Sequence, residues 1–173
     1  MLILNTGGTF NKRYNPISGK LEVPYDNLAV ETVLESLHPK STSSLTLTAH
    51  VKDQPLAGTV YKDSLDITAD DRKMIASIIL QSTEKVFVVV HGTDTMHLSA
   101  ALLDALVEDQ AVIFTGAMVP FHIDPVEATA NLAMAIGFAK SNPPKGAYIC
   151  MSGEVLPHDQ IQKNRALGVF ERV

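Results

Sequence analysis

The sequence predicts one α/β domain spanning residues 1–173, built as an open parallel sheet with helices on both faces. Two observations predict this fold. Short apolar runs of strand length recur along the chain, and several are apolar almost throughout, as in strands covered on both faces. Segments between them repeat apolar residues at helical spacing. This alternation indicates a three-layer sandwich of the Rossmann or flavodoxin type.

The strands are expected in the apolar runs. These runs are Met1–Leu4, Leu45–Val51, Lys85–Val90, Ala111–Thr115 and Ala147–Met151. Ligands of such sheets bind at the carboxyl ends of the strands, near a switch in strand order. Polar residues that directly follow these runs are therefore the candidates for a site.

The helices are expected at 27–37, 68–82, 95–107 and 124–140. Thr68 is a candidate N-cap with Asp71 three residues later, which is close to a capping box. Thr95 is a candidate N-cap of the third helix. The fourth helix has the clearest start, with Asp124 as the cap, Pro125 at the first helical position and Glu127 at the third.

Composition narrows the class of protein. The net charge of −5 argues against a nucleic-acid partner, which needs a basic face. No apolar run approaches the roughly 18 residues of a membrane helix, and the start MLILNTGG lacks the charged beginning of a signal peptide. We therefore expect a cytoplasmic protein with no membrane contact. The single cysteine, Cys150, permits no internal disulfide and is interpreted as a buried, inert thiol.

The stretch HGTDT follows the third apolar run. Gly92 permits a sharp turn there, which directs Thr93 and Asp94 into the crevice at the start of the next helix. The alternative interpretation is purely structural, with Thr95 capping that helix and Asp94 complementing its dipole.

The stretch TGGT follows the first run in the same way and ends at Thr9. Its glycines, including Gly8, allow close approach to a ligand and are expected to leave backbone amides free to face an anion. The alternative is a plain glycine-rich turn. KDSLDIT is expected to bring Ser64 and Asp66 to the same edge of the sheet.

Three residue types together suggest acyl transfer. A threonine hydroxyl is a weak nucleophile that needs a neighbouring base. Lys163 can serve if burial lowers its pKa, with Asp94 to orient it and Thr93 as the hydroxyl. Taken alone, Lys163 is more simply interpreted as an exposed surface lysine. No group of histidine, cysteine and carboxylate residues has metal-ligand spacing, so no metal or other cofactor is expected.

The motifs TGGTF, HGTDTM, TGAMVP, KDSLDIT and QIQKNRA resemble those of the bacterial-type L-asparaginase family, in the family's order, from about residue 3 to the end. The resemblance covers that family's N-terminal domain, and its smaller C-terminal domain is expected to be absent. It implies that Thr9 is the first nucleophile and that Thr93, Asp94 and Lys163 form the second catalytic group. It implies that Tyr14, or else Tyr25, activates Thr9.

The same resemblance implies a substrate pocket. Ser64 would hold the substrate α-carboxylate and Asp94 the α-ammonium, with Asp66, Gly8 and Gly92 beside them. Leu65 departs from the family, which often has a polar residue for the ammonium at this position. Loss of the second domain would weaken substrate fixation further.

The expected function is hydrolysis of L-asparagine to L-aspartate and ammonia, with glutamine left open as a substrate. One alternative is an amino-acid-binding sensor or assembly protein with little or no activity. A subunit of a tRNA-dependent amidotransferase is disfavoured by the acidic charge. A homo-oligomer, either a dimer or a tetramer, is expected because a missing domain would leave apolar surface.

Overall fold

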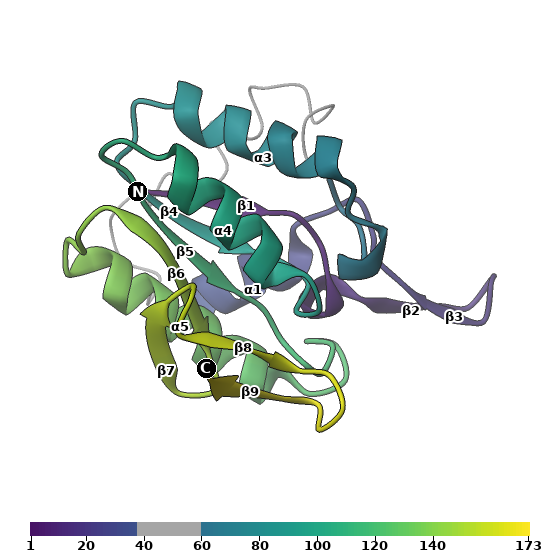
Figure 1. The fold of residues 1–173 in the computed structure, drawn as a ribbon. Helices are drawn as coiled ribbons and strands as arrows, with labels where there is room; N and C mark the ends of the chain where they lie inside the picture. Colours follow the sequence, from purple (N-terminus) through teal and green to yellow (C-terminus); the bar gives the residue numbers. More distant parts are fainter. Residues whose placement is uncertain (38–59) are drawn as a thin grey trace.

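The structure, a computed structural model, describes residues 1–37 and 60–173. Its centre is a five-stranded sheet in the order β1-β4-β5-β6-β7 (Figure 1). The first four strands run parallel, and they are β1 (Leu2–Asn5), β4 (Val86–Val90), β5 (Ala111–Thr115) and β6 (Gly146–Met151). The predicted parallel α/β sheet is therefore confirmed, while the expected strand Leu45–Val51 lies outside the described residues.

The fifth strand, β7 (Glu154–Pro157), is antiparallel to β6 and was not predicted. Its cause is a two-residue turn, because Ser152 and Gly153 both adopt positive φ angles, of 55° and 86°. Such turns connect neighbouring antiparallel strands directly. The sheet is thus mostly parallel with one antiparallel edge.

Helices cover both faces of the sheet, as expected. On one face lie α3 (Ala69–Gln81) and α4 (Met96–Leu106), and on the other α1 (Leu28–Leu37) and α5 (Pro125–Lys140) (Figure 1). The alternation of β4 explains both layers: Phe87 and Val89 join the first core, whereas Val88 and Val90 join the second. Within the described ranges, no helix has the length and apolar character to cross a membrane.

The predicted helix starts hold with one correction. Thr68 and Asp71 form the full capping box of α3, and Asp124 caps α5 by accepting a hydrogen bond from Val126 N. Thr95 does occupy the N-cap position of α4, but its side chain makes no capping hydrogen bond. Its hydroxyl instead donates to Ser64 O at 2.8 Å. The interpretation of Thr95 as a capping side chain was therefore wrong.

Two hairpins flank the sheet. The first, β2 (Arg13–Asn15) with β3 (Lys20–Glu22), projects away from the body (Figure 1). The second, β8 (Ile161–Asn164) with β9 (Val169–Arg172), is anchored by Ile161, which is buried in the α3–α4 core. This second hairpin places Lys163 on a strand.

Candidate active site

Three loops meet at the carboxyl edge of the sheet. A side chain at Gly8 would collide with the backbone of Gly92, and a side chain at Gly92 would in turn collide with Ser64. Gly8 also has a φ angle of 74°, which favours glycine. Because Thr9 follows Gly8 and Thr93 follows Gly92, the two threonines directly follow the point where these two loops touch. The predicted convergence of these loops is what the structure shows.

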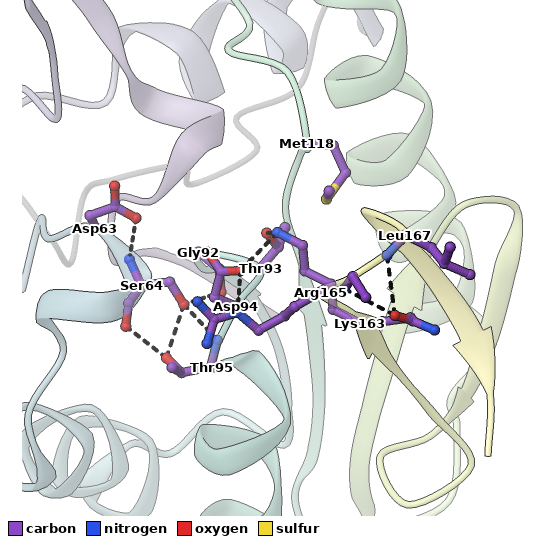
Figure 2. Close-up of polar contacts among 12 residues, drawn as sticks. Asp63, Ser64, Gly92, Thr93, Asp94, Thr95, Met118, Lys163, Arg165 and Leu167 are labelled. Carbon is purple, nitrogen blue, oxygen red and sulfur yellow. Dashed lines mark hydrogen bonds and ion pairs between the residues drawn. The ribbon is translucent and has the colours of Figure 1, made fainter.

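The hydroxyl of Thr93 lies beside an amine and a carboxylate. Lys163 Nζ donates to Thr93 Oγ1 at 2.9 Å and to Asp94 Oδ1 at 2.9 Å (Figure 2). Thr93 is 3% exposed and the Lys163 side chain 12%, so the amine is largely shielded from water. The interpretation of Lys163 as an exposed surface lysine is therefore wrong.

Ser64 is tied into the protein. It is 1% exposed, and its Oγ accepts a hydrogen bond from Thr95 N at 2.7 Å. The oxygen also lies 3.0 Å from Gly92 O and 2.9 Å from Thr95 Oγ1, either of which can take its single proton. Since Thr95 Oγ1 donates to Ser64 O, the two loops are locked together. Ser64 thus fixes the position of the Thr93 loop.

His91 supports the same loop from the core. Its Nδ1 lies 2.7 Å from Gly92 O, and because a carbonyl only accepts, Nδ1 carries the proton. Ser99 Oγ then donates to His91 Nε2 at 2.9 Å and accepts from Arg72 Nε at 3.1 Å. Complete burial, with the nearby Arg72 charge, lowers the pKa of His91 to about 4. The imidazole is therefore neutral at pH 7.

The glycine-loop amides are not free, contrary to expectation. Gly7 N donates to Asn5 Oδ1 at 3.0 Å, and Gly8 N donates to Lys62 O at 2.9 Å. The turn uses these amides to bind its own strand and the segment before Ser64. They are consequently unavailable to an oxyanion, and Gly8 contributes close backbone packing.

Other residues predicted for the site lie at its margin. Tyr14 is 61% exposed on the projecting β2–β3 hairpin, whereas Tyr25 is 82% exposed and stacks edge-on against Tyr61. Among the described residues, neither tyrosine makes a hydrogen bond to Thr9, so its activation by one of them stays a prediction. Leu65 is 59% exposed, and Asp66 is exposed in the short 3₁₀ helix η3 (Ser64–Asp66).

The prediction missed one cation beside the site. Arg165 Nε lies 3.5 Å from Asp94 Oδ1, the oxygen that Lys163 also contacts (Figure 2). Strand alternation gave no signal for it, because β8 (Ile161–Asn164) ends before Arg165, which lies in the turn of the hairpin. Within the described chain, no group of three or more histidine, cysteine, aspartate or glutamate residues is arranged to hold a metal ion.

The fold and the site define an α/β domain that carries a buried hydroxyl beside a partly buried amine and carboxylate at the carboxyl edge of its sheet. A model of the family described as asparaginase, N-terminal, matches residues 1–170. The chain therefore belongs to the asparaginase family and corresponds to its N-terminal domain.

The curated relatives carry several names. The chain is 33% identical to the 60 kDa lysophospholipase of Mus musculus over 79% of this chain and 27% of that protein. It is 28% identical to a subunit of the glutamyl-tRNA(Gln) amidotransferase of Methanococcus vannielii over 88% of this chain and 34% of that protein. The chain thus spans about a third or less of the length of these two relatives.

The L-asparaginase of Thermococcus kodakarensis is 24% identical over 98% of this chain and 49% of that protein. Its solved structure matches with a TM-score of 0.74 at 20% identity, over 99% of this chain and 50% of that chain. L-asparaginase I of Vibrio cholerae matches with a TM-score of 0.72 at 22% identity, over the same shares of the two chains. These structural matches show a common fold.

Proposed function

We propose that this protein hydrolyses a carboxamide, with L-asparagine as the first substrate to test. The observation that carries the proposal is the pair of partly buried hydrogen bonds from Lys163 to Thr93 and to Asp94, because a hydroxyl becomes a useful nucleophile or water activator beside an amine. Membership of the asparaginase family supports the same chemistry.

In the proposed reaction, Thr9 Oγ1 attacks the amide carbonyl. The C–N bond then breaks, and the nitrogen leaves as ammonia with the threonine proton. Water next attacks the acyl-enzyme and restores Thr9. The Thr93 hydroxyl would activate this water by passing its proton to Lys163, which must first lose a proton because its Nζ donates to Thr93 Oγ1 in this structure. Asp94 would hold Lys163 in place by charge and hydrogen bonding.

The test is ammonia release from L-asparagine and L-glutamine by the pure protein. We expect Thr9→Ala, Thr93→Ala and Lys163→Met each to lower kcat/KM by about 100-fold or more, since each removes a group that attacks or moves a proton. Lys145→Met is the matched control, because Lys145 is exposed outside the site. Activity that survives both threonine substitutions would contradict the proposed roles.

A second candidate function is binding of a small ligand without turnover. It is favoured by the exposure of Tyr14, which is expected to activate Thr9 but is 61% exposed on the β2–β3 hairpin. The exposed, apolar Leu65 points the same way. Binding measured by calorimetry in the absence of any ammonia release would select this function.

A further inference from the structure

The carboxylate of Asp94 is shared by two cations. Lys163 Nζ and Arg165 Nε contact the same oxygen, Oδ1, at 2.9 Å and 3.5 Å. The other carboxylate at the edge of the site, Asp63, pairs with Lys12 and accepts a hydrogen bond from Ser64 N. Asp63 and Asp94 are therefore both already paired with cations.

Arg165 is held at one side of its guanidinium only. Its side chain extends from the β8–β9 hairpin back over Asp94, and it is 63% exposed (Figure 2). Among the described residues, its two terminal nitrogens make no hydrogen bond. Arg172 on β9 differs, because its Nε and Nη2 both donate to Glu154, at 3.0 Å and 2.7 Å. Both donating sides of Arg172 are thus used by Glu154, whereas the terminal nitrogens of Arg165 stay open beside Asp94.

A guanidinium fork matches the two oxygens of a carboxylate. Ser64 is poorly placed to compete for such a group, because it is 1% exposed and its one proton is used within the protein. An ammonium group would find weaker partners, because Asp63 and Asp94 are already paired with cations, Leu65 is apolar, and the carboxylate of Asp66 lies exposed to water.

On the basis of the proposed function, we infer that Arg165 binds the carboxylate of the substrate. We further infer that the site prefers amides that carry a carboxylate but no free ammonium. Succinamate is the simplest such compound, because it is asparagine without the α-amino group.

The inference is tested by measuring ammonia release from three amides. Succinamate carries a carboxylate, L-asparagine carries a carboxylate and an ammonium group, and butyramide carries neither. We expect kcat/KM to fall in that order. Arg165→Gln should lower kcat/KM for succinamate about 10- to 100-fold, mainly through KM, as expected for one charge-assisted contact. The value for butyramide should not change. Arg172→Gln removes the same charge on the neighbouring strand and should leave all three values unchanged.

The outcomes separate the two proposals. If asparagine is the better substrate and Arg165→Gln affects all three amides equally, the inference is overturned while the proposed function stands. If no amide releases ammonia, the proposed function fails. In that case, succinate binding measured by calorimetry tests separately whether Arg165 binds a carboxylate. Binding weakened by Arg165→Gln but not by Arg172→Gln supports it, and equal binding in both variants overturns it.

Discussion

At the scale of single residues, a chain of hydrogen bonds supports the Thr93 loop, and the partners in this chain determine which atom carries each proton. The chain of donors runs from Arg72 through Ser99 and His91 to Gly92 O, and each step has one acceptor. This direction requires a neutral His91. Protonation of Nε2 would turn the acceptor for Ser99 into a second donor and place a charge near Arg72.

The pKa of His91 makes stability depend on pH. Its folded-state value of about 4 lies below the ordinary value of 6.5, so the unfolded chain binds the proton more tightly. The stabilisation is complete above pH 6.5 and is lost as the pH falls toward 4. We expect this residue to lower the free energy of unfolding by about 2 kcal/mol between pH 7 and pH 5, as measured by urea denaturation.

The variant His91→Asn separates this residue from other titrating groups. Asparagine retains an amide donor for Gly92 O but does not titrate, so this part of the pH dependence should disappear. His122→Asn, at an exposed histidine, serves as the control and should keep the wild-type slope. An unchanged slope in His91→Asn would show that another group causes the loss of stability at low pH.

The sequence predicted Thr93, Asp94 and Lys163 because their residue types suit one reaction and their motifs resemble a known family. The sequence could not predict which N–H and O–H groups already donate hydrogen bonds within the protein. Gly8 N and the Ser64 hydroxyl looked available for a ligand, yet both are satisfied by residues distant in sequence, Lys62 and Gly92. Arg165 was missed because its ion pair with Asp94 depends on the turn of the β8–β9 hairpin, which was not predicted.

At the scale of secondary-structure elements, the helix starts tie the site to the sheet. Asp71 closes the capping box of α3 and also accepts hydrogen bonds from Lys62 Nζ at 2.7 and 2.9 Å. The backbone of Lys62 in turn binds Thr6 O and Gly8 N. The first turn of α3 is therefore linked to the loop that carries Thr9.

Removal of the α3 cap should be measurable. We expect Thr68→Ala to lower the free energy of unfolding by about 1 kcal/mol, because Asp71 N loses its acceptor. Thr68→Ser should restore most of this loss. Thr32→Ala, in the exposed middle of α1, is the control and should not destabilise, since alanine favours helix. Equal effects of the two alanine substitutions in urea denaturation would refute the capping role.

Periodicity and caps predicted the four helices and the parallel strands, because those elements bury one face or both. The strands β7 and β9, at the edges of their sheets, show neither an apolar run nor a helical or strand periodicity in the sequence. All four residues of β7 (Glu154–Pro157) are half-buried, and β9 (Val169–Arg172) is largely exposed, so neither shows an apolar run or a clear alternation. Their pairing is set by tight turns and by the buried anchor Ile161.

At the scale of the whole molecule, self-association stays a prediction. The outer side of α4 presents Leu98, 49% exposed, and Leu106, 43% exposed, with the half-buried Leu102 between them. We expect light scattering to give a dimer or tetramer, and Leu98→Glu to reduce the mass to that of a monomer. Val126→Glu, at an exposed valine on α5, should not do so. A wild-type protein that scatters as a monomer at every concentration would refute self-association.

The β8–β9 hairpin has a consequence for biosynthesis. Thr93 leaves the ribosome 70 residues before Lys163, the residue whose amine contacts it. A nascent chain cannot form this contact until the β8–β9 hairpin has been synthesised. The pairing of hydroxyl and amine would then need no cleavage event, only the docking of this hairpin.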